Sequence, residues 1–371
     1  MLYSGIDLHK RSLVIHTLDE GGATVAEREL PTERRAVRAY FAVLPGDHRA
    51  VVECISSWYW LRDLLVPAGI DLRLGHAKYL KAISYAKVKT DRVDARTLAQ
   101  LLRVNLVPEA HMIDPVRREW RDLLRARLEL VVRQMRCRHT IGGLLDKYNV
   151  PTPERLPPLV RLQATLHAEQ QTMLARHIAQ VEDALRTHLL ATPEVQRLAW
   201  VPGIGHMVAY TIVLEVDDIR RFPTVRHFHS YCRLVPGAAN SGGKTRHKRS
   251  RDGNRYLKLA FHHAAIRAVQ YFPEVKAEYQ RWTRRKGKSI ARALVAKELA
   301  TIAYAMLTKD EPFNNTFHGH VVTTEKQARW PRLASPARLT DARPRPRGTH
   351  DARRGSSPLI GRPTGAPSAR I

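Results

Sequence analysis

Residues 2–30 have the sequence LYSGIDLHKRSLVIHTLDEGGATVAEREL, and this stretch decides the fold class of the first part of the chain. Residues 2–7 and 13–18 are rich in apolar and β-branched side chains, and residues 24–30 form a third candidate strand. The polar segment DEGG at residues 19–22 predicts a hairpin turn before that third strand. The stretch therefore predicts the first three strands of a sheet.

The chain up to about residue 105 continues with strands that alternate with helices. The expected strands lie at residues 50–54 and 71–74, and the expected helices at residues 32–43, 58–66 and 91–102, with another helix carrying Lys78, Lys81 and Lys87. Thr32 is a suitable N-cap for the first of these helices. Strands that begin in a hairpin and then alternate with helices predict a mixed α/β domain, which we assign to residues 1–108.

Long amphipathic helices are predicted for residues 109–198. Apolar residues recur there every three or four positions, as in Trp120, Leu124, Leu128, Val131 and Met135, which is the stripe of a packed or coiled-coil helix. Prolines between residues 151 and 158 divide the region into two runs. The stripe fits two helices packed within one chain and a dimerisation arm equally well. Residues 199–312 are expected to form a third, mostly helical domain, so the predicted class is α/β plus all-α.

The charge of the chain indicates a polyanionic partner. Lys and Arg number 62 against 35 Asp and Glu, which gives a formal net charge of +27, and such an excess suits nucleic acid or an anionic membrane. No apolar run approaches the roughly 20 residues that cross a bilayer, and no signal-peptide pattern is present. The three cysteines form neither a disulfide framework nor a zinc pattern. These features favour nucleic acid as the partner, no membrane association and a cytoplasmic location.

The C-terminal segment, residues 326–371, has a different composition. Residues 327–371 contain ten Arg, seven Pro and two Asp, with few large apolar side chains. Such a segment cannot bury enough apolar surface to offset the entropy lost on ordering. We therefore predict a disordered basic tail, to which the sequence assigns no function.

Four carboxylates stand out in the first domain. Asp7 lies inside the first strand, Glu53 ends an apolar strand, and Asp91 and Asp94 are spaced to share one face of a helix. A buried acid is costly unless it is paired or binds metal, and Mg²⁺ prefers oxygen ligands. Two such ions, about 3.5–4 Å apart, promote phosphoryl transfer. Simpler roles remain open, since Asp91 suits a helix cap and Asp94 or Glu53 suits an ion pair.

Two segments of the third domain suit contact with phosphates. Residues 201–205 (VPGIG) match the hairpin of a helix-hairpin-helix motif, in which Gly203 and Gly205 let backbone N–H groups approach a phosphate; the alternative is an ordinary helix–helix turn. Ser241 lies in a glycine-flanked loop, and five cations follow within ten residues: Lys244, Arg246, Lys248, Arg249 and Arg251. The serine suits a nucleophile, but it also suits a simple turn residue.

The chain resembles the DEDD insertion-sequence transposases of the IS110 group, which are relatives of the pilin-gene invertases. In the first domain the resemblance rests on residues 5–10 (GIDLHK), on Glu53 followed by Tyr59 and Trp60, and on residues 89–96 (KTDRVDAR). In the third domain it rests on residues 202–205 (PGIG), on residues 234–236 (LVP) and on Ser241 with Gly242. It covers about residues 3–310. Where members commonly have Ala-Thr-Gly after the glutamate, this chain has Cys54, Ile55 and Ser56.

The resemblance implies a fold, a chemistry and partners. It implies a RuvC-like, ribonuclease-H-type first domain whose Asp7, Glu53, Asp91 and Asp94 hold Mg²⁺, with two ions expected. It implies a C-terminal transposase domain in which Ser241 is the nucleophile of DNA strand cleavage and exchange. It also implies a structured guide RNA from the element's flank and a dimer or tetramer with a site shared between subunits. The expected nucleic-acid contacts are Lys87, Lys89, Arg96, Gly203, Gly205, Lys244, Arg246, Lys248, Arg249 and Arg251.

Two other functions fit the same residues. A RuvC- or ribonuclease-H-like nuclease would use the four carboxylates with water as the nucleophile, and Ser241 would be a bystander. A non-catalytic nucleic-acid-binding remnant would need no metal chemistry. The sequence leaves open whether a recombinase inserts, excises or inverts DNA.

Overall fold

The computed structural model describes residues 1–55, 57–83, 90–188, 192–241, 244–248 and 252–322. Within these ranges, side chains are described except at 187–188, 238–241 and 244–248. The predicted tail at residues 326–371 therefore lies outside the described residues, as do Lys87, Lys89, Arg249 and Arg251.

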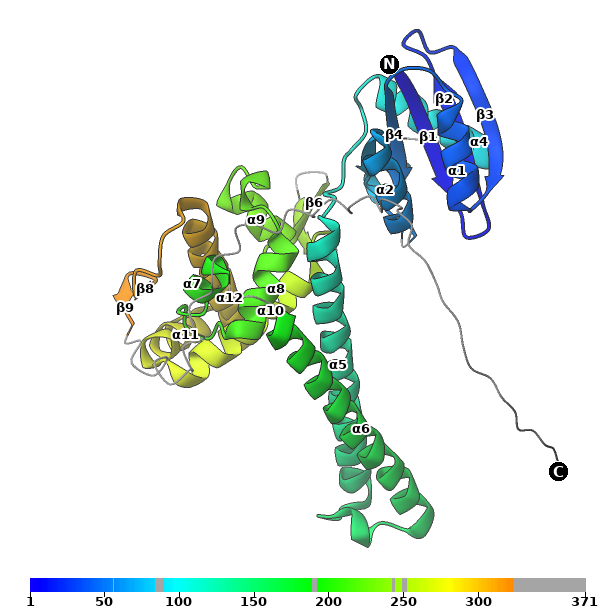
Figure 1. Ribbon diagram of the computed structural model, residues 1–371. Helices are drawn as coiled ribbons and strands as arrows, with labels where there is room; N and C mark the ends of the chain where they lie inside the picture. The colour runs from blue at the N-terminus through cyan, green and yellow to red at the C-terminus, as the bar shows by residue number, and fades with distance from the viewer. Residues whose placement is uncertain (56, 84–89, 189–191, 242–243, 249–251, 323–371) are drawn as a thin grey trace, which may run out of the picture. The chain divides into compact units, whose positions relative to one another are not determined.

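A five-stranded mixed sheet forms the first part of the chain (Figure 1). Its strands are β1 (Leu2–Leu8), β2 (Ser12–Leu18), β3 (Thr24–Pro31), β4 (His48–Glu53) and β5 (Asp71–Gly75), in the order β3-β2-β1-β4-β5. β1, β2 and β3 are antiparallel neighbours, whereas β4 runs parallel to β1 and β5 parallel to β4. The predicted hairpin and the predicted mixed α/β class are confirmed.

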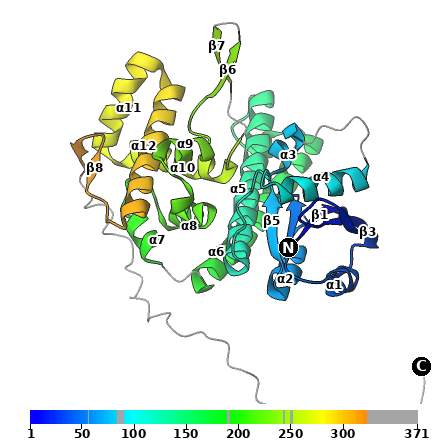
Figure 2. The same cartoon turned by 90° about the horizontal axis from the view of Figure 1, so that it is seen from above.

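Helices cover both faces of this sheet. They are α1 (Arg34–Ala42), α2 (Tyr59–Leu65) with a 3₁₀ turn at Val66–Ala68, α3 (Ala77–Ile83) and α4 (Asp91–Arg103). Figure 2 shows α3 and α4 on one side of the strands and α1 and α2 on the other. Side chains alternate along a strand, so Ile6 and Val52 pack toward α1 and α2, while Val51 packs against Leu80 and Leu98 of α3 and α4.

The first helix begins later than predicted, and Glu33 rather than Thr32 is its N-cap. Thr32 has other partners: its hydroxyl donates to the backbone carbonyl of His9 at 2.9 Å, and its backbone N–H donates to that of Arg11 at 3.1 Å. The chain after β3 is thereby fastened to the turn between β1 and β2.

Two long helices follow, α5 (Pro115–Tyr148) and α6 (Pro158–His188), with a 3₁₀ turn at Pro153–Arg155 between them. They pack against each other over much of their length (Figure 1). α5 ends at Asn149, which adopts the left-handed conformation of a C-cap. The predicted pair of helices is confirmed, and the apolar stripe is used for packing within the chain; dimerisation through this hairpin stays a prediction.

The remainder is mostly helical, as predicted. It contains α7 (Pro193–Leu198), α8 (His206–Val216), a 3₁₀ turn at Ile219–Arg221, α9 (Val225–Tyr231), α10 (Arg255–Tyr271), α11 (Pro273–Lys286), α12 (Lys288–Lys309), and the two-stranded pairs β6–β7 (Gly237–Ser241, Lys244–Lys248) and β8–β9 (Thr316–Phe317, His320–Val321). Its core centres on Phe228 and Phe261 and includes Leu124 of α5. None of the described helices is long and apolar enough to cross a membrane.

Candidate active site

A close approach between a helix and a strand creates the carboxylate site. A Cβ atom at Gly5 of β1 would lie 2.0 Å from the carbonyl oxygen of Ala95 and 2.5 Å from the backbone nitrogen of Ala99. Only glycine therefore lets α4 rest directly on β1. Because side chains two residues apart share a face of a strand, Asp7 lies on the same face as Gly5, toward α4.

The other three acids lie on this side of the sheet as well. Glu53 is two residues beyond Val51, whose side chain packs toward α4. β1 and β4 are parallel neighbours with Ile6 opposite Val52, so Asp7 and Glu53 are the next residues along adjacent strands. Asp91 and Asp94 lie in the first turn of α4. Thr90, not Asp91, caps this helix, because the Thr90 hydroxyl accepts the N–H of Val93 at 3.2 Å.

The tightest cluster of possible metal ligands at this site includes a histidine that the sequence analysis did not single out. The ligand atoms of Asp7, His9 and Asp91 all lie within 4.8 Å of one another, whereas Glu53 and Asp94 lie outside this group. His9 Nε2 is 3.1 Å from Asp7 Oδ2 and 3.4 Å from Asp91 Oδ1. The available signal was its spacing: two residues after Asp7 in GIDLHK, at the point where β1 ends.

Burial and neighbouring charges shift the pKa values of Asp7 and His9. Burial raises the pKa of Asp7, the His9 imidazole opposes that rise, and the nearby Asp91 and Asp94 add to it. Burial lowers the pKa of His9, but the charges and hydrogen bonds of Asp7 and Asp91 together outweigh burial, so the pKa of His9 is raised. The carboxylates thus favour a positive charge among them.

The donor set fits a divalent cation. Carboxylate oxygens from a strand and from a helix face one another with an imidazole beside them, and oxygen-rich sites of this kind suit Mg²⁺ or Mn²⁺. Asp7 is the most enclosed donor of the group, since its side chain is 14% exposed against 56% for Asp91. One side of the group is therefore open to solvent.

Cations accompany the acids on α4. Arg92 and Arg96 are exposed and lie one turn apart, and Arg92 Nη1 is 3.5 Å from Glu27 Oε1 of β3. Glu27 in turn contacts the buried imidazole of His16 at 2.8 Å. The predicted phosphate contact at Arg96 stays a prediction, and its exposure leaves it accessible.

The glycine turn before α8 has a packing role. Gly203 has a φ of +78°, and a Cβ atom there would lie 2.1 Å from the carbonyl oxygen of Ala264 in α10. Gly205 is the N-cap of α8. Packing against α10 is thus sufficient reason for glycine at position 203, and phosphate binding by Gly203 and Gly205 stays a prediction.

Ser241 is in a strand, not in the predicted loop. It is the last residue of β6, and its backbone pairs with Lys244, the first residue of β7. Arg246 and Lys248 follow along β7. Strand pairing resumes directly after two glycines, so the backbone around Ser241 is extended. Its side chain and those of the three cations lie outside the described ones.

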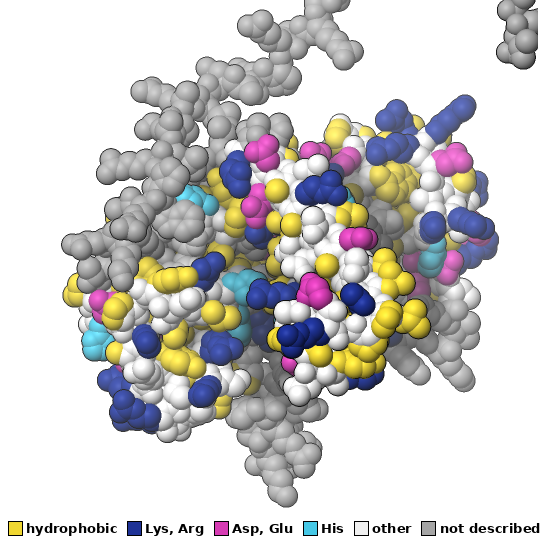
Figure 3. Space-filling model, turned by 90° about the horizontal axis from the view of Figure 1, so that it is seen from below, with side chains coloured by type: hydrophobic (Ala, Val, Ile, Leu, Met, Phe, Trp, Pro, Cys, Tyr) yellow, Lys and Arg dark blue, Asp and Glu magenta, His cyan; other side chains and the backbone are white. Residues whose placement is uncertain are grey.

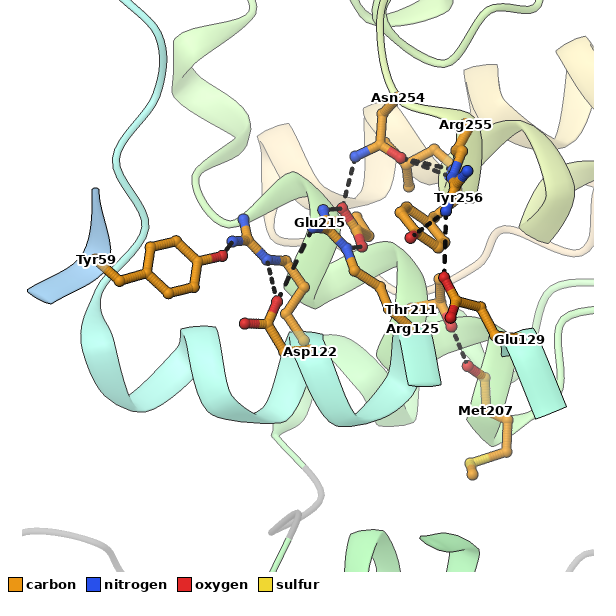
Figure 4. Close-up of polar contacts among 12 residues, drawn as sticks. Tyr59, Asp122, Arg125, Glu129, Met207, Thr211, Glu215, Asn254, Arg255 and Tyr256 are labelled. Atoms are coloured by element: carbon orange, nitrogen blue, oxygen red, sulfur yellow. Dashed lines mark hydrogen bonds and ion pairs between the residues drawn. The ribbon is translucent and has the colours of Figure 1, made fainter. Parts of the chain in front are cut away.

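A partly buried ion pair holds the chain at Asn254, just beyond this hairpin. Glu215 of α8, only 4% exposed, accepts two hydrogen bonds from Arg125 of α5, at 2.6 and 2.7 Å (Figure 4). It accepts a third from Asn254 at 2.6 Å. The Asn254 side-chain oxygen caps α10 by accepting the N–H groups of Tyr256 and Leu257. Sequence reasoning missed this network, whose one signal was an acid inside the apolar helix HMVAYTIVLEV.

The chain is also constrained just before Asn254. The Asn254 N–H donates to the carbonyl oxygen of Tyr231 at 2.6 Å, and Arg233 Nε donates to that of Gly253 at 2.7 Å. Gly253 has a φ of +93°, and a Cβ atom there would lie 2.4 Å from the Tyr231 carbonyl oxygen. The two ends of the segment that carries Ser241 are therefore held together.

The basic residues are not confined to one patch. On the face shown in Figure 3, Lys and Arg side chains form several separate groups, with acidic and hydrophobic side chains between them.

Two family models match separate parts of the chain. The model of the DEDD transposase domain of the IS110 type matches residues 4–150, and the model described as "Transposase IS116/IS110/IS902 family" matches residues 195–280. The region matched by the first model contains all four acids and His9. The region matched by the second contains Glu215, Asn254 and the β6–β7 pair with Ser241, which we call the serine hairpin.

Individual proteins are similar over most of their length. A "Probable family 20 transposase" of Pseudomonas aeruginosa is 29% identical over 82% of this chain and 96% of its own. The "Transposase for insertion sequence element IS1328" of Yersinia enterocolitica is 25% identical over 84% of this chain and 98% of its own. A "Pilin gene-inverting protein" of Moraxella bovis is 29% identical over 38% of this chain and 46% of its own. The chain is thus a member of the IS116/IS110/IS902 family of transposases.

Proposed function

We propose that this transposase cuts and rejoins DNA strands at the carboxylate site, in a metal-dependent reaction with Ser241 as the nucleophile. The observation that carries the proposal is the convergence of Asp7, Asp91 and Asp94 at the end of β1, on the sheet face that Glu53 shares. The strand order β3-β2-β1-β4-β5, with only β2 antiparallel to both of its neighbours, supports a RuvC-like, ribonuclease-H-type fold for this domain.

The carboxylates have a defined task in this proposal. Asp7, Glu53, Asp91 and Asp94 would hold Mg²⁺, and we expect two ions. A bound cation would neutralise charge on the scissile phosphate and polarise its oxygens. Four carboxylates without a bound cation would repel a negatively charged phosphate. The proposed reaction would therefore require a divalent cation.

The serine step exchanges one phosphate ester for another. The Ser241 hydroxyl loses its proton and its oxygen attacks phosphorus, so a phosphoserine bond forms while the bond from phosphorus to the 3′ oxygen breaks. The 3′ oxygen takes up a proton and leaves as a free hydroxyl. The reverse step, with a different 3′ hydroxyl, rejoins the DNA. Lys244, Arg246 and Lys248 follow Ser241 closely enough in sequence to contact neighbouring phosphates.

Partners beyond DNA are also proposed. The net charge of +27 suits a structured guide RNA held by its backbone and shape. A dimer or tetramer would let the carboxylates of one subunit act with the Ser241 of another. The guide RNA and the oligomer are separate proposals, and either can be wrong while Ser241 is still the nucleophile.

A trapping assay tests the chemistry. The protein is mixed with Mg²⁺, labelled donor DNA carrying the element's ends and RNA transcribed from the flank, then denatured and separated by size. We expect a labelled protein–DNA adduct that is lost with Ser241→Ala and with Asp7→Asn. It should persist with Ser289→Ala and Glu33→Gln, which change an exposed serine and an exposed acid elsewhere.

The other outcomes distinguish the alternatives. Metal-dependent cutting without an adduct, unaffected by Ser241→Ala, would identify a nuclease that uses water. Binding of DNA with neither cutting nor adduct would identify a protein that only binds nucleic acid.

A further inference from the structure

We propose that His9 is a nitrogen ligand of the metal centre, alongside Asp7 and Asp91. The proposal rests on the metal-dependent function above and adds an imidazole to what would otherwise be an all-oxygen site. It gives the centre a mixed character that carboxylates alone do not provide.

The geometry around the imidazole carries the inference. One ring atom, Nε2, faces both Asp7 Oδ2 at 3.1 Å and Asp91 Oδ1 at 3.4 Å. These two carboxylates come from different elements, a strand and a helix, and the same nitrogen meets both. A cation held by Asp7 and Asp91 would therefore lie in the space that Nε2 faces.

The backbone that carries His9 is fixed. The His9 N–H donates to the carbonyl oxygen of Ser12 at 3.0 Å, and the His9 carbonyl accepts the Thr32 hydroxyl at 2.9 Å. The Thr32 N–H donates to the Arg11 carbonyl, two residues further along the same turn, at 3.1 Å. Backbone motion would break these bonds, so only rotation of the side chain can take the imidazole away from the acids.

The alternative is that His9 is only a counter-ion for the acids. In that case the imidazole would rotate outward when a cation arrives, and its half-exposed side chain leaves room for that movement. A ligand and a counter-ion therefore predict opposite positions of Nε2 in the metal-loaded protein, near the ion or away from it.

A nitrogen ligand also changes which ion is preferred. Carboxylates suit Mg²⁺ and Mn²⁺ alike, whereas imidazole favours first-row transition ions over Mg²⁺. We expect the full-length protein to bind Mn²⁺ more tightly than Mg²⁺. His9→Gln should weaken Mn²⁺ binding by about tenfold, the lower end of what loss of a supporting group costs a metal site, and should weaken Mg²⁺ binding less.

The test is pulsed electron paramagnetic resonance of the purified protein loaded with Mn²⁺. We expect a ¹⁴N coupling on Mn²⁺ in the wild type that is lost in His9→Gln and kept in His320→Gln, which removes an exposed histidine far along the sequence. Labelling the histidines with ¹⁵N should change the coupling to that of ¹⁵N.

The outcomes separate this inference from the proposed function. Mn²⁺ binding that is lost in Asp7→Asn, but that shows no nitrogen coupling and is unchanged by His9→Gln, would overturn the His9 ligand and leave the carboxylate centre standing. Failure of the wild type to bind Mn²⁺ or Mg²⁺ at all would contradict both.

Discussion

The carboxylate site and the serine hairpin are built in opposite ways. The acids project from a five-stranded sheet and from a helix whose backbone touches that sheet at Gly5. Ser241 ends one strand of a pair that, among the described residues, pairs with no other strand. An isolated hairpin is at best marginally stable in water. The position of the serine therefore depends on the base of the hairpin, where Asn254 and Glu215 meet.

The two sites differ in how rigidly their side chains are held. A metal centre requires ligands fixed to within a fraction of an ångström, and strand–helix contact supplies that. The proposed nucleophile Ser241 lies on a two-stranded hairpin that, among the described residues, pairs with no other strand, so less of its backbone is held in place. Damage to the support of the hairpin should therefore reduce adduct formation and spare metal binding, whereas damage at Gly5 should reduce both.

The largest effect on stability is expected from Glu215→Ala, which breaks the support of the hairpin. The change removes one partner of a buried pair and leaves Arg125 and Asn254 without their acceptor, at a cost of about 3–5 kcal/mol. Urea denaturation measures this loss. Glu129→Ala, which breaks an exposed pair with Arg255 in the same region, should cost less than about 1 kcal/mol.

The same variant should also separate the two sites in their functions. Under conditions where Glu215→Ala remains folded, it should form less protein–DNA adduct while binding Mn²⁺ as the wild type does. Loss of Mn²⁺ binding in this variant would show that the two supports are not independent.

Gly5→Ala breaks the other support. The added methyl group would overlap the backbone of α4 and force the helix off the sheet, which we expect to cost about 2–3 kcal/mol. Because Asp91 and Asp94 move with α4, Mn²⁺ affinity should fall with stability. Calorimetric titration of Mn²⁺ measures the affinity. A variant that keeps wild-type stability would contradict the close approach at Gly5.

Acid should weaken the helical region through His229. Burial, with a smaller effect of Lys297, lowers the pKa of His229 to about 4, whereas an unfolded histidine titrates near 6.5. Between those values the unfolded chain binds a proton that the folded chain does not. The contribution of His229 to the free energy of unfolding is therefore fully present above about pH 6.5. It is lost as the pH falls toward 4, by on the order of 2 kcal/mol.

Unfolding of His229→Gln at several pH values checks this. The slope of the free energy of unfolding between pH 4 and 6.5 should be smaller than in the wild type, whereas His320→Gln should keep the wild-type slope. Equal slopes in all three proteins would exclude His229 as the source.

The smallest effect has the opposite sign. Gly143 lies inside α5, and nothing lies within 4 Å of a Cβ atom placed on it. Gly143→Ala should therefore stabilise the helix by up to about 1 kcal/mol, seen as a higher thermal midpoint. Destabilisation would indicate that this face of α5 is occupied by a partner, such as a second copy of the chain.

Much of the carboxylate site could be predicted from the sequence. Asp7 inside an apolar strand and the three-residue spacing of Asp91 and Asp94 are local patterns, and the structure brings these acids to one face. His9 was missed because its contacts with Asp7 and Asp91 depend on where the strand ends. The prediction that Thr32 caps the first helix was wrong, because the Thr32 hydroxyl instead donates to the carbonyl oxygen of His9, 23 residues earlier in the chain.

The serine region was harder to predict for a physical reason. Two glycines and a run of cations read as a loop, yet backbone pairing between Ser241 and Lys244 makes both residues parts of strands. The support from Glu215, Arg125 and Asn254 joins residues 39 and 90 positions apart. No local pattern encodes such pairs.

The alternation of strands and helices, the long helical pair, the basic charge and the presence of four candidate acids in the first domain could all be read from the sequence alone. These follow from periodicity and residue type, which act over a few neighbouring positions. Three features came only from the folded structure: α4 lies on Gly5, His9 faces two acids, and the pair of Glu215 and Arg125 holds the chain at Asn254, beyond the serine hairpin. Those features depend on contacts between distant segments, and such contacts exist only after the chain has packed.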